Sequence, residues 1–291
     1  MANSLLIAVL SIFFFSCGNM NRDMAVDKNE LVGSDYRLFQ STPAWELAKA
    51  VQDENESKIN EIVSKDPKLI NYQDPKYGNT LLILTVMNQQ IKPFKILLAN
   101  KADLSIHNTY DGTSALIEAC NSKHYDTKFA DILLQNGAEI NDVEVGKRRE
   151  GNSTRFTPLM AASKTGKIDL VKLLVKKGVD LNYQNEYKQS ALSQAVKLKK
   201  YEVILFLLQN RVDYKLPITY NQEQGKTYYL ADELRFYMPD IGSSEYKYKM
   251  QIVNFLKSKG IDYRATPIPE YIKKKAQEEY PKSWQEYLEK Y

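Results

Sequence analysis

Apolar and polar positions follow one recurring order from about residue 40 onward. A Thr or Ser is followed at once by an apolar segment, and a second apolar segment then ends in a small residue and an acid. Leu170, Leu173 and Leu174 show the i, i+3, i+4 spacing of an amphipathic helix, so each unit is predicted to be a helix pair. A period near 33 residues indicates stacked repeats. The predicted unit starts are Thr42, Thr80, Ser114, Thr157, Ser190 and Thr227.

The residues at the segment ends are those that begin and end helices. A Thr or Ser hydroxyl can accept a hydrogen bond from the free amides of a first turn. Pro43 and Pro158 follow two of these residues, at the first helical position, where the missing N–H costs nothing. Lys101 and Arg211 stand where other units have a glycine, so we expect those two helix ends to be less stable. The glycines that supply a left-handed stop are Gly137, Gly178 and Gly260.

The best-formed unit resembles the ankyrin repeat, which opens with Gly-x-Thr-Pro-Leu-His-x-Ala and closes with Gly-Ala-Asp. Residues 157–162 read Thr-Pro-Leu-Met-Ala-Ala, and residues 178–180 read Gly-Val-Asp. Residues 78–82 and 112–116 are variants of the same opening. The resemblance covers about residues 40–263, as about five units and a degenerate first one. It implies an all-α ankyrin-repeat solenoid of stacked helix pairs with long connecting turns.

The first 17 residues have a different character. They carry no charged side chain, and Leu5 to Phe15 is almost wholly apolar. Because about 20 apolar residues are needed to cross a bilayer, this run predicts an export signal rather than a membrane-spanning helix. Phe14-Phe15-Ser16-Cys17 resembles a bacterial lipobox, which implies a lipid anchor at Cys17 and a place on the periplasmic side of the envelope. Phe14 replaces the usual Leu and no basic residue precedes the run, so a cytoplasmic chain stays the alternative.

Two further segments complete the predicted organisation. Residues 18–39 are polar and aperiodic, which predicts a tether between anchor and fold. Residues 264–291 predict a C-terminal helical cap, because Trp284, Tyr287, Leu288 and Tyr291 share one helix face and a terminal repeat must cover its open apolar side. Long insertions at 143–156 and 237–246 interrupt the array, and such loops are more often functional or mobile than core.

Composition and charge limit the partners. The chain is 43% apolar and 26% charged, which is ordinary for a globular protein. The 40 basic and 36 acidic residues are interspersed, and the densest basic runs, 147–149 and 273–275, are short. Nucleic-acid readers concentrate basic residues on one face, so no nucleic-acid partner is expected.

The sequence shows little that points to an enzyme. It has two histidines, His107 and His124, and no phosphate-binding glycine loop, metal-spaced Cys/His cluster or nucleophile elbow. Cys120 lies in an apolar helical pattern and is predicted to be a buried, inert thiol. We therefore predict no catalytic residue, no metal and no cofactor. Five acids recur with the repeat, which predicts a structural role: Asp103, Glu139, Asp180, Asp213 and Asp262.

The connecting turns are rich in tyrosine, a residue that offers a large, rigid contact area with a polar tip. The resemblance implies that these turns and the concave helix face bind proteins. We predict a partner-binding surface there, and the alternative is that the rings pack between neighbouring turns. The candidate residues are Tyr72, Tyr77, Tyr110, Tyr183 and Tyr187.

Together these patterns predict an exported, lipid-anchored, non-enzymatic protein that binds and neutralises a partner protein, as an immunity protein does. The alternatives are an envelope scaffold that organises or shields other proteins, and an intracellular adaptor if residues 1–17 are no signal. The identity of the partner is not readable from these residues.

Overall fold

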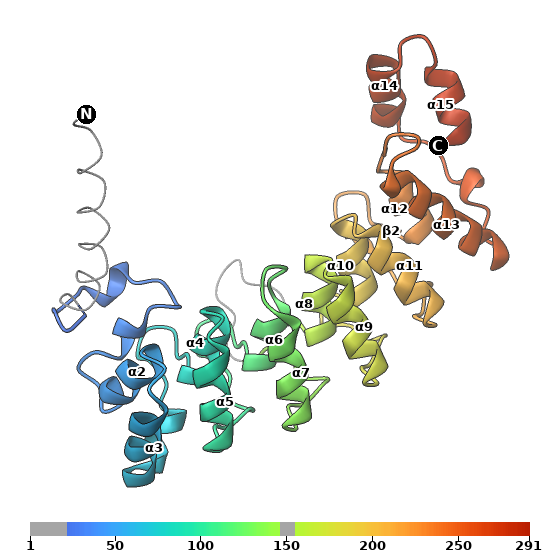
Figure 1. Ribbon diagram of the computed structural model, residues 1–291. Coiled ribbons are helices and arrows are strands. Elements are labelled where there is room, and N and C mark those ends of the chain that lie inside the picture. Colours follow the sequence, from blue (N-terminus) through green and yellow to red (C-terminus); the bar gives the residue numbers. More distant parts are fainter. Residues whose placement is uncertain (1–21, 146–154) are drawn as a thin grey trace, which may run out of the picture. The chain divides into compact units, whose positions relative to one another are not determined.

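A computed structural model describes residues 22–145 and 155–291 (Figure 1). The chain divides into two compact units between Ala115 and Leu116, which we call unit 1 and unit 2. Regular structure in the described residues is almost wholly helical, with one two-stranded hairpin. The all-α fold class of stacked helix pairs, predicted from the sequence, is confirmed. Among residues 22–145 and 155–291, no helix combines the length and apolar character needed to span a bilayer.

Unit 1 contains two helix pairs. Helix α2 packs on α3, helix α4 packs on α5, and the second pair stacks on the first through α2–α4 and α3–α5 contacts. Leu47, Leu84 and Leu97 are fully buried between these helices. The elements of unit 1 are η1 (Lys28–Glu30), η2 (Tyr36–Phe39), α2 (Trp45–Gln52), α3 (Glu56–Lys65), η3 (Pro67–Asn71), α4 (Leu81–Met87) and α5 (Ile91–Ala99).

Unit 2 continues the same arrangement. First helices stack on first helices, as α8 on α10 and α10 on α12, and second helices stack in the order α7, α9, α11 and α13 (Figure 1). The elements of unit 2 are α6 (Ala115–Cys120), α7 (Thr127–Gln135), α8 (Pro158–Thr165), α9 (Ile168–Lys176), α10 (Ala191–Lys197), α11 (Tyr201–Gln209), β1 (Thr219–Asn221), β2 (Lys226–Tyr228), α12 (Leu230–Leu234), α13 (Ser244–Ser258), η4 (Tyr263–Ala265), α14 (Glu270–Glu279) and α15 (Trp284–Lys290).

Three of the predicted helix starts are capped as expected. Thr80, Thr157 and Ser190 each accept a hydrogen bond from the amide three residues later, and Pro158 is the first helical residue. The prediction at Thr42 is wrong, because α2 begins at Trp45 and the Thr42 hydroxyl instead donates to the Phe39 carbonyl at 2.6 Å. The prediction at Thr227 is also wrong. This residue lies in strand β2, paired with Tyr220, and the next helix begins at Leu230.

The recurring acids have the predicted structural role. Each accepts a hydrogen bond from the amide two residues later, so each closes the turn that follows a helix pair. The amides of three of these acids are also held by an asparagine of the preceding repeat. The Asp103 amide donates to the Asn71 side-chain oxygen at 2.9 Å, and the amides of Asp180 and Asp213 donate to those of Asn141 and Asn182 at 2.8 Å. These bonds from backbone amide to side chain join successive repeats.

The two helix ends predicted to be less stable carry a left-handed residue that is not glycine, as do the ends of α2, α4 and α10. Lys101 has φ 63° and Arg211 has φ 69°, whereas Gly178 has φ 88° at the corresponding place. A residue with a Cβ is strained in this conformation by about 1–2 kcal/mol. The predicted lower stability of these two helix ends therefore comes from the strained backbone conformation of Lys101 and Arg211.

We expect Lys101→Gly and Arg211→Gly each to raise the free energy of unfolding by about 1 kcal/mol, because glycine relieves the left-handed strain. Gly178→Ala is expected to lower it by a similar amount. Urea melts measure these changes. The control is Lys95→Gly, at an exposed position inside α5, which should destabilise by about 1 kcal/mol. Equal destabilisation by Lys95→Gly and Lys101→Gly would contradict the assignment.

The segment predicted to be a polar tether, residues 18–39, differs from that expectation where it is described, from Arg22 on. Its end packs on α2, and Tyr36, Leu38 and Phe39 are buried. The segment escaped prediction because short 3₁₀ turns and extended backbone leave no helical period in the sequence. Cys17, the predicted lipidation site, lies outside the described residues.

The ends of the first insertion are held together. The Glu144 amide donates to the Phe156 carbonyl at 3.0 Å, and the Phe156 amide donates to the Glu144 carboxylate at 2.9 Å. Both residues are buried. Residues 146–154 between them lie outside the described part of the chain.

Residues of the second insertion, 237–246, form hydrogen bonds with the C-terminal helical segment. Asp240 accepts a hydrogen bond from the Tyr280 hydroxyl, and the Pro239 carbonyl accepts one from the Tyr287 hydroxyl, both at 2.9 Å. The predicted aromatic stripe is packed core. Tyr287 and Tyr291 are buried with Ile272 and Ala276, and Trp284 and Leu288 lie partly buried at the edge of this cluster.

Candidate partner-binding surface

Three connecting turns are built by the same local device. Asp74, Asn108 and Asn185 each accept two or more main-chain amide hydrogen bonds from the residues that follow. A carboxylate or amide oxygen that bonds the backbone ahead of it forms a compact turn. The three turns then present a tyrosine two or three residues later, at Tyr77, Tyr110 and Tyr187. The tyrosines that we predicted to bind a partner are thus placed by the backbone of their own turns.

In unit 1 the predicted tyrosines are largely engaged within the chain. The Tyr77 and Tyr110 rings meet edge to face with centroids 5.1 Å apart. The Tyr77 hydroxyl donates to the Leu31 carbonyl at 2.9 Å, and Tyr72 lies 6.3 Å from the Phe39 ring. Packing between neighbouring turns, the alternative to partner binding, therefore describes Tyr72 and Tyr77, while Tyr110 keeps an exposed face.

In unit 2 the predicted Tyr187 is exposed and borders a cleft of about 510 Å³. Tyr220 and Tyr229 line the same cleft, and their exposed fractions, 60% and 46%, exceed the 43% of Tyr187. We call this the tyrosine cleft; Gln189 and Lys197 also line it. The predicted Tyr183 is half-buried and does not line it. Three aromatic rings around one concave surface form the arrangement that protein interfaces use for their central contacts.

The hairpin β1–β2 sets the orientation of two of these rings. Its strands pair in antiparallel register, with Thr219 opposite Tyr228. The Ile218 side chain is buried at the start of the hairpin, and its amide donates to the Tyr228 carbonyl at 3.0 Å. Tyr220 at the centre of β1 is exposed, while Thr219 and Asn221 on either side of it are half-buried. Tyr229 is held at the helix start, where its amide donates to Asp232 at 2.9 Å.

Two charged residues in this region are withdrawn from water: Lys197, which lines the cleft, is half-buried, and Glu233 on α12 is buried. Burial lowers the pKa of Lys197 below its usual 10.5, and the charge of Glu233 opposes that shift. Burial likewise raises the pKa of Glu233, against the hydrogen bond from Thr219. Burial therefore disfavours the charged form of both side chains. A partner group that forms a hydrogen bond with Lys197 would offset part of the free-energy cost of removing its charge from water.

Tyr220, Tyr229 and Lys197 were not among the residues predicted from the sequence. The signal for the hairpin was present, since Thr219-Tyr220-Asn221 and Lys226-Thr227-Tyr228 flank a turn with Gly225. We interpreted Thr227 as a repeat start instead. No local pattern indicated that the hairpin and the turn at Tyr187 border one cleft.

Other candidate residues have structural surroundings. Cys120 is fully buried, as predicted, and burial raises the pKa of its thiol, which makes it unreactive. His124 is exposed in the turn before α7, and the His107 carbonyl accepts a hydrogen bond from the Gln73 side chain at 2.8 Å. Within residues 22–145 and 155–291, no three His, Cys, Asp or Glu side chains are placed to hold a metal ion.

A family model for ankyrin repeats in three copies matches residues 47–144 and 142–217, which is more than half of the chain. The chain belongs to the ankyrin-repeat family. Ankyrin repeats are protein–protein interaction modules, and the family is typically non-enzymatic. The matched residues contain the pairs α2–α3 (from residue 47 on), α4–α5, α6–α7, α8–α9 and α10–α11, and the tyrosine-bearing turns are the connections between these pairs.

The chain is similar to several ankyrin-repeat relatives over part of their length. It is 27% identical over 166 residues to an ankyrin repeat protein of Acanthamoeba polyphaga mimivirus, and 31% identical over 78 residues to a second one from that virus. It is 24% identical over 187 residues to alpha-latrotoxin-Lg1a of Latrodectus geometricus. These matches cover 57%, 27% and 64% of this chain but only 20%, 46% and 12% of the relatives.

Proposed function

We propose that this ankyrin-repeat protein holds a partner protein in the tyrosine cleft of unit 2 and carries out no chemistry on it. The observation that carries the proposal is the convergence of three exposed tyrosines, Tyr187, Tyr220 and Tyr229, on one concave surface. They come from a repeat turn, from strand β1 and from the start of α12. The family supports the protein-binding part, because ankyrin repeats serve as interaction modules.

We further propose that the protein acts in the bacterial cell envelope, anchored through a lipid on Cys17, and neutralises its partner there. The support is the apolar run from Leu5 to Phe15 and the lipobox-like Phe14-Phe15-Ser16-Cys17 that ends it. Neutralisation needs only a surface complementary to one partner, which the cleft supplies without any reactive group.

Affinity capture of the mature chain from its native cells tests the cleft. We expect the wild-type chain to recover one dominant protein, and Tyr187→Ala/Tyr220→Ala/Tyr229→Ala to bind that protein at least tenfold more weakly, because truncated interface tyrosines are frequent hot spots. The matched control replaces three equally exposed large side chains of unit 2 outside the cleft: Val145, Ile241 and Tyr271. Equal recovery by the cleft variant and the wild type, with both folded, would remove the cleft from the proposal.

Cys17→Ala tests the location. The wild-type chain is expected to fractionate with envelope membranes and to incorporate labelled fatty acid, and the variant to do neither. A mature chain in the cytoplasm with Met1 or Ala2 intact would instead establish the intracellular adaptor. Recovery of several weak partners, rather than one tight one, would establish the envelope scaffold.

A further inference from the structure

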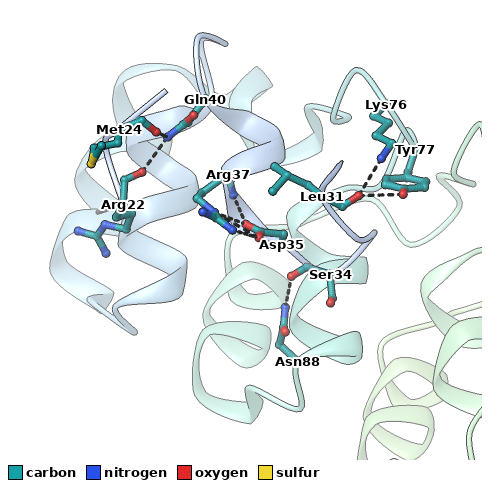
Figure 2. A network of polar contacts seen from close by, with 10 residues as sticks. All are labelled: Arg22, Met24, Leu31, Ser34, Asp35, Arg37, Gln40, Lys76, Tyr77 and Asn88. Carbon is teal, nitrogen blue, oxygen red and sulfur yellow. Dashed lines mark hydrogen bonds and ion pairs between the residues drawn. The ribbon is translucent and has the colours of Figure 1, made fainter. Parts of the chain in front are cut away.

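A short stretch of the N-terminal segment, residues 31–36, lies on the rest of unit 1 and is held mainly by its backbone; we call it the strap. It forms a turn at residues 33 and 34, closed by the Asp35 amide, which donates to the Val32 carbonyl at 3.1 Å. The Leu31 carbonyl accepts hydrogen bonds from Lys76 Nζ at 2.8 Å and from the Tyr77 hydroxyl at 2.9 Å (Figure 2). The Gly33 carbonyl accepts one from Asn79 Nδ2 at 3.1 Å, and the Ser34 carbonyl accepts one from Asn88 Nδ2 at 2.8 Å. Every donor is a side chain of unit 1, and every acceptor is main chain.

Two side chains of the strap add apolar anchors at its ends. Leu31 and Tyr36 are buried, and the Tyr36 hydroxyl bonds the Gln90 side chain. Val32 between them is 64% exposed. The surface therefore recognises a backbone turn with two anchors five residues apart, and it makes few contacts with the side chains between them.

The surface beneath the strap is equivalent to the tyrosine cleft. The repeat beneath the strap has Thr80 as the cap of its first helix, α4, and the repeat at the tyrosine cleft has Ser190 as the cap of its first helix, α10. Counted from these caps, Tyr77 corresponds to Tyr187, Asn79 to Gln189 and Met87 to Lys197. The second member of each pair lines the tyrosine cleft.

Gly33 of the strap lies directly over the first members of these pairs. A Cβ built on it would lie 3.5 Å from an Asn79 side-chain atom, 3.6 Å from Met87 and 3.8 Å from Tyr77. The positions that are open in unit 2 are thus covered in unit 1 by the protein's own chain.

We propose that the surface formed by Lys76, Tyr77, Asn79, Met87 and Asn88 binds a turn-forming segment of a partner protein, and that the strap occupies this surface in cis until that segment displaces it. This rests on the proposed protein-binding function and extends it from unit 2 to unit 1. A cleft of about 600 Å³, bordered by Val32, Ser34, Tyr36 and Asn88, opens beside the strap, so an incoming segment has room before the strap leaves.

A tethered occupant competes strongly with one in solution. A segment on a short linker has a millimolar effective concentration at its own site. The apparent affinity of a free segment falls in proportion to the fraction of molecules whose surface is open. Weakening the strap should therefore increase the affinity for a free segment without any change in the surface itself.

The probe is a fluorescein-labelled synthetic peptide with the sequence of residues 27–40, and fluorescence anisotropy measures its binding to the full chain. Gly33→Val weakens the strap, because its γ-methyl groups would meet Asn79 and Met87, while both anchors stay in place. We expect this variant to bind the peptide at least tenfold more tightly than the wild type. Leu31→Asp/Tyr36→Ala, which removes both anchors, should show the same gain, and circular dichroism checks that each variant is folded. Equal binding by the wild type and Gly33→Val would overturn the proposal.

A matched pair of asparagines tests whether the peptide binds beneath the strap. Asn88 and Asn100 each bond a carbonyl of the last turn of their own helix, at 3.0 and 2.9 Å, but Asn88 also bonds the strap while Asn100 bonds Asn60. In the Gly33→Val background, Asn88→Ala should weaken peptide binding severalfold and Asn100→Ala should not change it. Equal losses would show that the peptide binds elsewhere, which overturns the proposal.

A second peptide distinguishes a partner segment from a second copy of this chain. It keeps Leu and Tyr at the positions of Leu31 and Tyr36 and has alanine at those of Val32 and Asp35. Binding within threefold of the first peptide supports a surface that accepts a partner's turn-forming segment. Loss of binding would overturn the partner assignment and leave the strap of a second copy as the occupant. Because these measurements use no captured protein, their failure is separate from that of the cleft in unit 2.

Discussion

Replacing Lys249 with methionine is expected to raise the free energy of unfolding at pH 7 by about 2–4 kcal/mol. The substitution removes the free-energy cost of deprotonating a buried lysine, and it loses one hydrogen bond, which offsets part of that gain. Lys249 projects from α13 into the interior and has no exposed surface. Its Nζ donates to the Tyr237 carbonyl at 3.0 Å and lies 3.6 Å from the centre of the Tyr291 ring. The neighbouring charged group is the buried guanidinium of Arg235, which also stacks on Tyr263.

The expected gain follows from the pKa of this lysine. Burial, and then repulsion from Arg235, lower the pKa of Lys249 from 10.5 to about 6. At neutral pH the unfolded chain holds a proton here that the folded chain has mostly released. Stability therefore rises with pH between about 6 and 10.5, by up to about 1.4 kcal/mol per pH unit, and is lowest below pH 6. Methionine fills a similar volume and has no proton to lose.

Urea melts of both chains at several pH values between 6.5 and 8.5 measure this effect. The wild-type free energy of unfolding should climb with pH more steeply than that of Lys249→Met, and the difference between the two should shrink as pH rises. The control is Lys257→Met, an exposed position on the same helix, which should leave both stability and slope unchanged. Parallel pH profiles for wild type and Lys249→Met would show that Lys249 keeps an ordinary pKa in the folded state.

Leu174→Ala is expected to lower the free energy of unfolding by about 2–5 kcal/mol, the range for a leucine truncation that leaves a cavity. Leu174 on α9 is fully buried, and α9 contacts α7, α8 and α11, so the cavity would lie between stacked repeats. The neighbouring Leu173 shares the apolar face in sequence but is only half-buried. Its truncation should cost about 1 kcal/mol, in proportion to the smaller apolar area removed from water.

The comparison of these two leucines is the measurement, in urea melts under one set of conditions. Both variants remove the same atoms from the same helix, so helix propensity and side-chain chemistry cancel. Equal losses for Leu173→Ala and Leu174→Ala would show that the contacts of α9 with its neighbours differ from those described above.

The same pair shows how far the sequence predicts the packing. Helical spacing placed Leu170, Leu173 and Leu174 on one apolar face, and that face is where α9 packs. A helix stripe is about 100° wide, however, and the helices that pack against it decide which part of it is buried. Only the neighbouring helices distinguish Leu174 from Leu173.

The candidate site was predictable to a smaller extent. The tyrosines of the connecting turns were visible in the sequence, and Tyr187 does border the cleft. Tyr220 and Tyr229 were missed because their part in it depends on a hairpin that approaches a turn about 30 residues earlier. A surface made by two separate segments leaves no local pattern.

What the sequence by itself determined are the features carried by neighbouring residues: the helix pairs, the caps at Thr80, Thr157 and Ser190, and the glycine stops. These depend on propensity and short-range hydrogen bonds, which a window of a few residues contains. Tertiary structure decided which tyrosines stay open, that the strap covers the surface of unit 1, and that Lys249 is buried beneath Tyr291. Each of these joins segments far apart in the chain, and burial is a property of what packs against a residue rather than of the residue.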